Sequence, residues 1–420
     1  MLCKVAAVAL NPADAKLIDE FQSPGCIGGQ DFAGHVVRVG EGVKRFKRGD
    51  RVFGFTFGLN PDDRASGAFS EYAAATEDLS CRIPSSMSFE EASTFGLSVG
   101  TAGFSLFRSL ALPTHASPTE DCFVLVAGGA TASGIAAIQI LKASGFMPVA
   151  TCSPSNMQML MALGAVATFD YHSETCGAEI RNYTENTLRH ALDCIATSET
   201  QRMCYDAIGT AGGKYTALNP PSTVVKYSRR DIYADSVVAW SLFGDAVRLA
   251  GTIGRPASHL DRIFASTFYP HAEDMIEKRL LKPPPCEVRP GGLEAIEKGI
   301  EDLRNGRLGT TEKRACLRKP SGNGIMRNIC LWPSASSRKH NIKKFAVIRP
   351  SWKIEEFDLV IEYWLHDLNE LKNLISDPEW TGRAAKDQAL WVDTDKASVQ
   401  IGYETLYLEE DGKIVNTEQK

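Results

Sequence analysis

The chain has 420 residues, of which 44% are hydrophobic and 23% are charged, and its formal net charge is -5. This length is enough for two or three domains with cores of their own. The small negative charge gives no reason to expect binding to nucleic acid or to an anionic membrane surface. No apolar run reaches the roughly 18 residues that a membrane-spanning helix needs.

The N-terminal segment is apolar only as far as Asn11 and Pro12. It is too short and too quickly interrupted for a signal peptide, so we expect a buried strand here and a cytoplasmic protein. The 11 cysteines are scattered and form no CxxC pair. Their distribution predicts buried, reduced thiols rather than a zinc site.

The first 317 residues show two kinds of pattern. Residues 1–120 contain short strand-like segments such as DRVFGF, and they end in a helical stretch over residues 88–112. This is typical of a β domain, which residues 260–317, with two helices and a strand between them, would complete. In residues 121–259, apolar strands alternate with helices, which predicts a doubly wound parallel sheet of the Rossmann type. The predicted strands are Phe123–Ala127, Pro148–Cys152, Ala165–Phe169, Ala191–Ile195 and Lys214–Leu218.

The remaining residues read as a linker and a small domain. Residues 318–344 are basic, contain Ser and Gly, and show no periodicity, which is typical of a linker. Residues 345–420 follow a β-α-β pattern with FDLVIEYW as a strand and a helix over residues 368–377. We therefore expect a small α+β, ferredoxin-like tail.

A glycine-rich turn follows the first predicted strand of the parallel sheet. Gly128, Gly129 and Gly134 lie where this strand turns into a helix, and Thr131 and Ser133 add hydroxyl donors. Glycines allow the backbone to approach a pyrophosphate, which the helix N-terminus then attracts. The spacing differs from GxGxxG, and a tight turn alone would explain it. Its place before five strand–helix alternations favours a dinucleotide site.

The end of the second strand bears on the choice of nucleotide. A cofactor without a 2'-phosphate usually meets an Asp or Glu there, whereas this chain reads ATCSPSN. Ser153, Ser155 and Asn156 are small donors suited to a phosphate monoester, which favours NADPH over NADH. Capping of the next helix is the alternative role for either serine.

Several motifs occur in the order found in the medium-chain dehydrogenase/reductase superfamily: NPADAK, GQDFAGHVVRVGEGVKRFKRGDRVFG, VLVAGGATASGIAAIQ and GGKYTALNP. Residues 1–317 resemble its zinc-free branch. ATCSPSN, FDYHS and LRHALDCI resemble the trans-acting enoyl reductases of fungal polyketide biosynthesis, of the lovastatin type. The resemblance implies a GroES-like domain, a Rossmann domain and NADPH in the cleft between them. It also implies a monomer that docks transiently on a polyketide synthase carrying the acyl substrate.

The resemblance also implies site residues. Lys16 and Thr101 would be the catalytic pair at the nicotinamide end, orienting the cofactor and organising the pocket. The substrate would lie along the helix at Thr101, Ala102, Gly103 and Phe104. The implied cofactor contacts are Ala13, Asp14, Ala15, Lys16, Ala130, Thr131, Ala132, Ser133, Ser153, Pro154, Ser155, Asn156, Tyr171, Leu218 and Asn219.

The metal-binding positions of the zinc branch are altered. NPADAK supplies no Cys at the first ligand position, and Gln30 replaces the His. His35 alone on a strand is a structural residue more often than a ligand. We therefore expect no catalytic metal. Hydride would add to the β-carbon, hydrogen-bond donors would stabilise the enolate oxygen, and water or an unassigned donor would protonate the α-carbon.

Both ends of the reductase part depart from the family pattern. The N-terminal hairpin is missing, and RACLRKPSGNG stands in place of the closing apolar strand. We expect this loss of edge strands to leave backbone unpaired. Ala15 stands where the family usually has an aromatic residue, which would open the cofactor pocket.

The tail resembles the latter half of an EthD-like dimeric α+β barrel, in FDLVIEYWLHDLNELKNLISDPEW and YETLYLEEDGKIV. Such domains often pair across a dimer, so a dimer formed through the tail is an alternative to the monomer. His366 is either a ligand or acid, or a solvated residue at a helix start. Either a gene fusion or a bifunctional enzyme would explain why the tail follows the reductase part.

Two alternative functions follow from the same residues. A stand-alone NADPH quinone or enone reductase would turn over small quinones and not enoyl thioesters. A non-catalytic fusion protein would bind nucleotide without turnover and associate through its tail.

Overall fold

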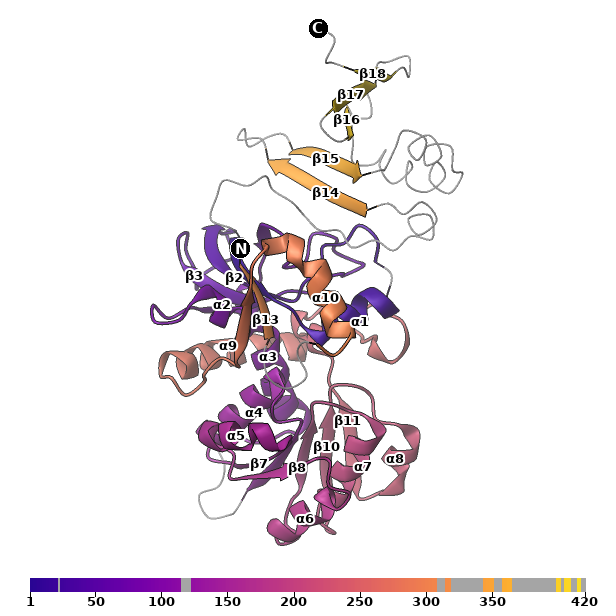
Figure 1. The fold of residues 1–420 in the computed structure, drawn as a ribbon. Coiled ribbons are helices and arrows are strands. Elements are labelled where there is room, and N and C mark those ends of the chain that lie inside the picture. Colours follow the sequence, from indigo (N-terminus) through magenta and orange to yellow (C-terminus); the bar gives the residue numbers. More distant parts are fainter. Residues whose placement is uncertain are drawn as a thin grey trace.

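The computed structural model describes residues 1–21, 23–114 and 122–307, and the backbone of six further strands between residues 314 and 416. Figure 1 shows two lobes, a β lobe that contains the N-terminus and an α/β lobe. Within the described part of the chain, no helix is long and apolar enough to cross a membrane.

The β lobe is built on a seven-stranded sheet in the order β12-β13-β1-β2-β3-β5, with β4 also paired to β1. Apart from β12–β13, its strand pairs are antiparallel. The predicted strand-like segment DRVFGF contains β3, as expected. The strands are β1 (Leu2–Ala9), β2 (Asp31–Arg38), β3 (Arg51–Phe55), β4 (Tyr72–Ala74), β5 (Ser80–Arg82), β12 (Cys286–Arg289) and β13 (Arg314–Arg318).

The expected loss of the closing strand is wrong. The segment Arg314–Arg318 forms β13, which pairs with β1 through Ala7↔Arg318 and Ala9↔Cys316. On its other side it runs parallel to β12. Strand pairing uses the backbone, so the short sequence RACLR fills this position without a long apolar run. The edge of β1 is therefore covered.

The α/β lobe contains a parallel sheet in the order β11-β10-β9-β6-β7-β8, the doubly wound arrangement of nucleotide-binding folds. The five predicted strands are confirmed, each within two residues at either end. β11 was not predicted, because IYADS lacks a continuous apolar run. The strands are β6 (Phe123–Ala127), β7 (Met147–Cys152), β8 (Ala167–Asp170), β9 (His190–Asp193), β10 (Gly213–Ala217) and β11 (Ile232–Ser236).

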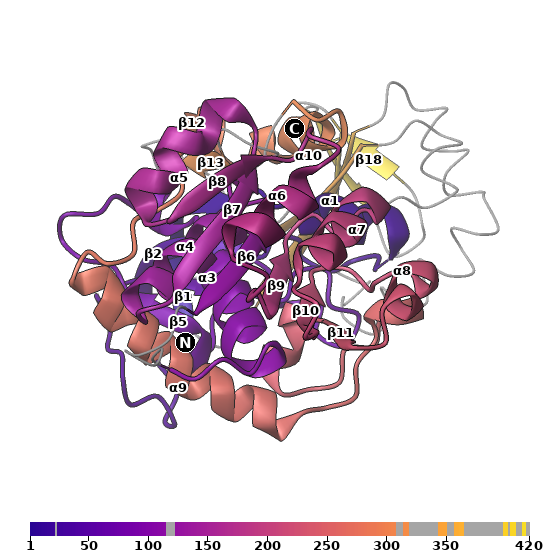
Figure 2. The same cartoon turned by 90° about the horizontal axis from the view of Figure 1, so that it is seen from below.

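Helices pack on both faces of this sheet (Figure 2). Along β6, Val124 and Val126 belong to one buried cluster, while Leu125 and Ala127 belong to another. Successive side chains of a strand point to opposite faces, so a strand buried on both sides must be apolar throughout. The helices are α4 (Ala132–Ala143), α5 (Met157–Leu163), α6 (Cys176–Tyr183), α7 (Ser198–Ala207) and α8 (Thr223–Ser228).

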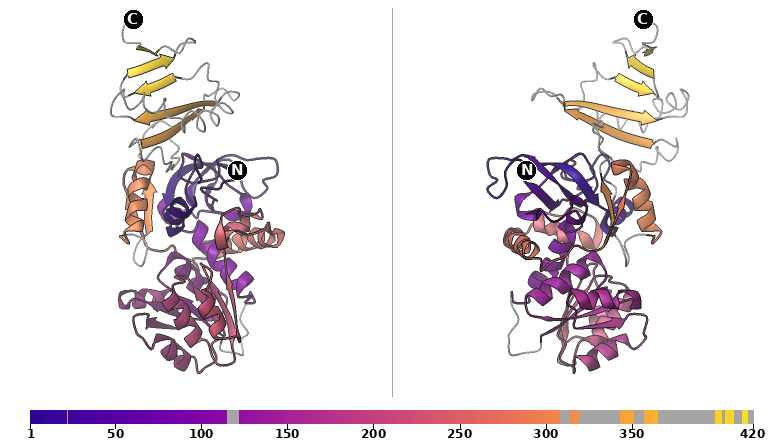
Figure 3. Two further views of the ribbon diagram at one scale, coloured as in Figure 1. Left: turned by 90° about the vertical axis from the view of Figure 1, so that its right-hand side faces the viewer. Right: turned by 60° about the vertical axis from the view of Figure 1, so that its left-hand side comes forward.

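The predicted helical stretch over residues 88–112 is confirmed, although it is divided. It comprises α2 (Phe89–Ala92), α3 (Gly96–Gly103) and a π-helical turn over Phe104–Ser109. The two helices and the strand predicted in residues 260–317 are also present: α9 (His259–Glu277), β12 and α10 (Ile296–Arg304). Near the N-terminus, α1 (Pro12–Glu20) packs beside α10, as Figure 3 shows.

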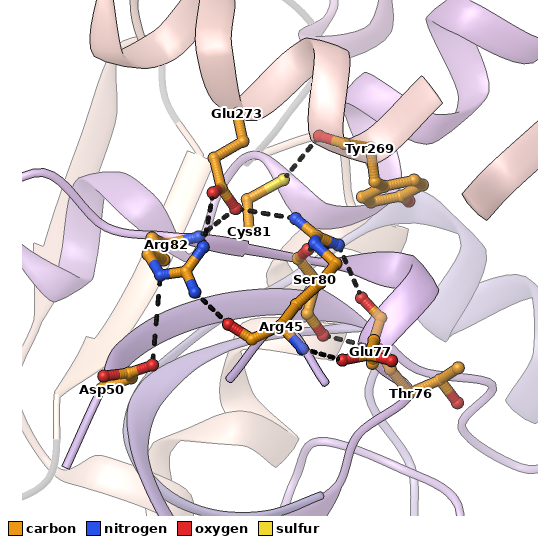
Figure 4. A network of polar contacts seen from close by, with 9 residues as sticks. All are labelled: Arg45, Asp50, Thr76, Glu77, Ser80, Cys81, Arg82, Tyr269 and Glu273. Atoms are coloured by element: carbon orange, nitrogen blue, oxygen red, sulfur yellow. Dashed lines mark hydrogen bonds and ion pairs between the residues drawn. The ribbon is translucent and has the colours of Figure 1, made fainter. Parts of the chain in front are cut away.

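A carboxylate on α9 ties this helix to the β lobe (Figure 4). Glu273 accepts hydrogen bonds from the side chains of Arg45 and Arg82, each at 2.9 Å, and from the backbone N–H of Arg82 at 2.8 Å. The Tyr269 hydroxyl donates to the Gly96 carbonyl of α3 at 3.0 Å. Helix α9 therefore packs as part of the β lobe, although it follows the parallel sheet in sequence.

In the tail, the structure describes five strands. β14 (Lys343–Pro350) pairs antiparallel with β15 (Phe357–Trp364), which is the predicted FDLVIEYW strand. β16 (Ser398–Ile401), β17 (Glu404–Leu408) and β18 (Ile414–Asn416) form a three-stranded antiparallel sheet. The helix predicted over residues 368–377 and His366 lie outside the described residues.

Candidate active site

A cavity of about 400 Å³ is formed by segments of both lobes. The β lobe contributes one face each of α1 and α3. The α/β lobe contributes the N-terminal turn of α4, the residues that follow β9 and β10, and the segment from Val237 to Trp240. The cavity thus lies at the carboxyl ends of parallel strands, where open α/β sheets usually bind ligands.

The predicted glycine turn shapes one wall of this cavity. Gly128 has a φ of 73°, a left-handed conformation that favours glycine. A Cβ at Gly134 would collide with the carbonyl oxygen of Gly128. Thr131 caps α4: its hydroxyl accepts from the Gly134 N–H at 3.0 Å and donates to the Gly128 carbonyl at 2.8 Å. Close packing and a capped helix start bring Ala130, Thr131, Ala132 and Ser133 to the cavity surface.

These features fit a dinucleotide. The first turn of a helix has N–H groups without helical partners and carries the positive end of the helix dipole, both of which attract a pyrophosphate. The glycines at 128 and 134 permit the tight turn and the close packing that hold this helix start in place. The fold and this wall define a two-lobed dinucleotide-binding protein.

The predicted adenosine-end residues lie at the same edge of the sheet, next to the turn. Ser153 follows β7, and Tyr171 follows β8 in the register Cys152↔Asp170. The hydroxyls of Ser153 and Ser155 are 3.1 Å apart, and the Asn156 amide donates to Ser153 at 2.9 Å. Pro154 begins the 3-10 turn that holds them. These residues do not line the 400 Å³ cavity, and they remain predicted contacts.

The neighbouring carboxylate of Asp170 is already engaged. It accepts from the backbone N–H of His172 at 3.0 Å and lies 2.7 Å from Nδ1 of the same residue. These bonds lower the pKa of Asp170. The ring of Tyr171 lies 4.1 Å from that of His172, and 43% of its surface is exposed.

The predicted catalytic residues both line the cavity. Lys16 lies on the same face of α1 as Ala13, and its ammonium group donates to Oδ1 of Asn219 at 2.7 Å. Leu218 and Asn219 follow β10 and also line the cavity. Thr101 is 7% exposed and lies one helical turn after Leu97, so both face the cavity from α3. Lys16, Thr101 and Asn219 thereby bring polar groups of both lobes to one cavity.

Besides the residues that follow β7 and β8, five further predicted contacts, two on α1 and three on α3, do not line the cavity. Asp14 lies away from it on α1, where its carboxylate accepts from the Asn11 N–H at 2.7 Å as part of the helix cap. Ala15 packs in a buried cluster with Ile296 and Ile300 of α10, so its small size does not open the cavity. A motif matches consecutive residues, whereas a helix turns only every third or fourth residue to one side.

The same reasoning applies to α3. A Cβ at Gly103 would collide with the ring of Phe268 on α9. Ala102 is fully buried, and the ring of Phe104 packs 5.8 Å from that of Phe264. Ala102, Gly103 and Phe104 therefore pack against the protein core, and of the predicted substrate residues only Thr101 lines the cavity.

Sequence reasoning missed several residues that line the cavity. Trp240, Val238 and the pair Pro284–Pro285 supply apolar surface, and no motif marks them. Cys194 and Ile195 also line it, at the end of the strand predicted over Ala191–Ile195. Burial raises the pKa of the Cys194 thiol to about 12, which excludes it as a thiolate nucleophile at neutral pH.

The positions that correspond to metal ligands in the zinc branch hold buried polar residues at or near the cavity. Asn11, Gln30 and Asp31 are at most 1% exposed. The Asn11 amide donates to Asp31 Oδ2 at 2.9 Å, and the Leu97 N–H donates to Asp31 Oδ1 at 2.5 Å. The described residues contain no group of three His, Cys, Asp or Glu side chains that could hold a metal. His35 is exposed and packs its ring edge-on against Phe89 at 5.0 Å.

Comparison with known proteins agrees with this architecture. The alcohol dehydrogenase GroES-like domain model matches residues 1–85, and the EthD domain model matches residues 318–395. The CurK enoyl reductase structure aligns with a TM-score of 0.58 at 20% identity, over 76% of this chain and 90% of that one. Quinone oxidoreductase of Escherichia coli, solved with NADPH, aligns with a TM-score of 0.57 at 18% identity, over 76% and 91%. These two likenesses concern the fold.

Sequence relatives define the family. A trans-enoyl reductase of Gibberella fujikuroi is 51% identical over 308 residues, which cover 73% of this chain and 89% of the relative. A trans-enoyl reductase of a Penicillium species is 46% identical over 310 residues, 73% of this chain and 88% of the relative. The chain belongs to the trans-enoyl reductase family.

Proposed function

We propose that this protein transfers hydride from NADPH to the α,β-unsaturated thioester of a polyketide intermediate that a separate fungal polyketide synthase carries. The observation that supports this most directly is the cavity itself. It joins a wall suited to a dinucleotide, the polar groups of Lys16, Thr101 and Asn219, and an apolar wall that includes Trp240 and Val238. An enoyl thioester needs this combination, with the acyl chain on apolar surface and its carbonyl near donors.

The bound nicotinamide cofactor would supply the hydride. The residues of this chain position the reactants and stabilise charge. As negative charge develops on the thioester oxygen, donors in a cavity sheltered from water stabilise it. The hydroxyl of Thr101 and the ammonium of Lys16 are the donors best placed on the cavity surface for this role. Water or an unassigned donor would supply the proton on the α-carbon.

Preference for NADPH over NADH is supported by the residues after β7. Ser153, Ser155 and Asn156 offer hydroxyl and amide groups without a carboxylate, and Asp170 on the next strand is held by His172. A carboxylate at the end of the second strand is the group that usually selects NADH. We propose that Tyr171 covers this end of the nucleotide.

We further propose the domain organisation predicted from the sequence. Residues 1–120, completed by about 260–317, would form the substrate domain, residues 121–259 the nucleotide domain, and residues 345–420 a partial EthD-like domain after a linker over 318–344. The reductase part would act as a monomer that docks transiently on the synthase. Dimerisation through the tail is the alternative.

The test is oxidation of NADPH by the full chain with crotonyl- and 2-methylcrotonyl-pantetheine thioesters. NADH replaces NADPH in one control, and a small quinone replaces the thioester in another. Turnover of the thioesters with NADPH supports the proposal, and Thr101→Val, which keeps shape but removes the hydroxyl, should lower it. Turnover of quinone alone would establish a quinone reductase. Binding of NADPH without any turnover would leave a non-catalytic nucleotide-binding protein.

A further inference from the structure

The indole of Trp240 is held in place by two residues of the β lobe. Trp240 lies in the 3-10 turn Ala239–Phe243, is 8% exposed and lines the cavity. Its ring stacks on Phe57 with centroids 5.2 Å apart and an interplanar angle of 17°. Its Nε1–H donates to Oε1 of Gln30 at 2.8 Å.

Gln30 itself has little freedom. It is fully buried, and its amide nitrogen donates to the Gly58 carbonyl at 3.3 Å. The oxygen of the side chain therefore points at Trp240. A buried donor that loses its acceptor is costly, so this bond fixes the plane of the indole. With the ring nitrogen engaged, the indole presents apolar atoms to the cavity.

The position of Trp240 in the cavity follows from its neighbours. Asp31, which follows Gln30, bonds the side chain of Asn11 and the N–H of Leu97. Asn11 and Leu97 both line the cavity, and Thr101 lies one turn beyond Leu97. The 3-10 turn that carries Trp240 packs against α3, with Leu242 beside Gly100, and both Trp240 and Thr101 line the cavity. A rigid wall there limits the volume available to the acyl group.

We infer that Trp240 is a specificity-determining residue that limits the length of the acyl group, and that Gln30 is a positioning residue that acts through Trp240. This inference rests on the proposed function, because it assumes that an acyl thioester occupies the cavity. Replacing the indole by a methyl group should open space for additional methylenes. Each buried methylene strengthens binding about four-fold.

The experiment measures binding, so that it does not depend on turnover. Dissociation constants of butyryl- and octanoyl-pantetheine are measured by calorimetry with the full chain saturated with NADP⁺. For Trp240→Ala we expect the preference for octanoyl over butyryl to rise at least ten-fold relative to the unmodified protein. The space left by the indole should bury two more methylenes of the octanoyl chain, which corresponds to about fifteen-fold tighter binding. An unchanged preference in a variant that still binds NADP⁺ would overturn the inference.

A double-mutant cycle tests the role of Gln30. Gln30→Met keeps the length of the side chain and removes the acceptor, and Trp240→Phe keeps the stacking on Phe57 and removes the donor. Each single change should shift the preference in the same direction. If Gln30 acts through Trp240, Gln30→Met should have no further effect in the Trp240→Phe background. Equal effects in both backgrounds would refute the positioning role.

Failure of the proposed function and failure of the inference on Trp240 would give different results. If the unmodified protein binds the acyl thioesters and reduces no enoyl thioester, the proposed function fails while the chain-length comparison still decides the role of Trp240. If it reduces crotonyl-pantetheine and Trp240→Ala leaves the preference unchanged, the inference fails alone. Binding of neither thioester by the unmodified protein would contradict both. Trp240→Phe provides the milder variant should Trp240→Ala not fold.

Discussion

The ammonium group of Lys16 donates a hydrogen bond to Oδ1 of Asn219 at 2.7 Å, although 203 positions separate the two residues. Lys16 belongs to α1 of the β lobe, and Asn219 follows β10 of the α/β lobe. Both line the cavity, so their contact spans the cleft at the site where we place the cofactor. It links the two lobes there.

Replacement of Lys16 by Met should weaken this link and remove a charged donor from the cavity. Under the proposed function the ammonium also donates to the reacting groups, and loss of such a charged hydrogen bond costs about 1.5–3 kcal/mol, so kcat/KM for NADPH should fall by roughly ten-fold or more. Steady-state kinetics with crotonyl-pantetheine measures it. Lys16→Arg, which keeps the charge, serves as the control and should retain more activity than Lys16→Met. Equal kcat/KM for Lys16→Met and the unmodified protein would contradict the role.

A carboxylate at position 155 should reverse the choice of nucleotide. Ser155 is exposed and its hydroxyl lies 3.1 Å from that of Ser153. In Ser155→Asp the new charge would repel a 2'-phosphate and could accept from a ribose hydroxyl, as acids do at this place in NAD-binding folds. We expect the NADPH/NADH ratio of kcat/KM to fall about ten-fold or more. Ser155→Ala is the matched control, and an unchanged ratio in Ser155→Asp would place the 2'-phosphate elsewhere.

The close approach at Gly134 predicts a severe effect of one methyl group. In Gly134→Ala the new Cβ would meet the Gly128 carbonyl oxygen, which belongs to the backbone and cannot rotate away. The glycine turn must shift, so NADPH should bind at least about ten-fold more weakly. Fluorescence titration with NADPH tests this. Gly42→Ala is the control, because a Cβ there has open space; tight binding by Gly134→Ala would show that the turn tolerates displacement.

The imidazole of His190 should make stability depend on pH. Burial lowers the pKa of His190 to about 4, and the charges of Lys214 and Arg189 act in the same direction. The unfolded chain takes up this proton near the ordinary value of about 6.5. The stabilising contribution is therefore fully present above that value and is lost as the pH falls toward about 4.

Between about pH 7.5 and pH 5 the loss amounts to about 2 kcal/mol of unfolding free energy. Urea unfolding of the full chain at both values measures it, and His190→Asn should show a correspondingly smaller decrease. His35→Asn, at an exposed imidazole, is the comparison that reports the background from other groups. A decrease of the same size in His190→Asn and in the unmodified protein would be incompatible with this assignment.

The sequence predicts the parts of the fold that depend on local patterns. Apolar strands such as Phe123–Ala127 and the glycines at 128 and 134 are local features, and the structure confirms their positions. β13 could not be predicted, because its place between β1 and β12 depends on strands about 300 and 30 positions away rather than on its own five residues.

The residues of the site were less predictable from the sequence than the strands and turns of the fold. The family resemblance implied Lys16, Thr101 and Asn219, which reach the cavity, but also Asp14 and Gly103, which face the core because helices α1 and α3 each expose one side. Trp240 was missed because its environment is made by Gln30 and Phe57, which are distant in sequence. Local pattern identifies the chemistry of a motif, and only the three-dimensional packing selects which of its residues contact a ligand.

The pairing of β13 has a practical consequence for dividing the chain. The EthD domain match begins at residue 318, which is also the last residue of β13 and is paired with Ala7 of β1. A truncation designed from the family boundary alone would thus cut into the sheet that the N-terminal strand needs. To produce the reductase part separately, the stop codon belongs after Arg318, and a protease site belongs beyond the same residue.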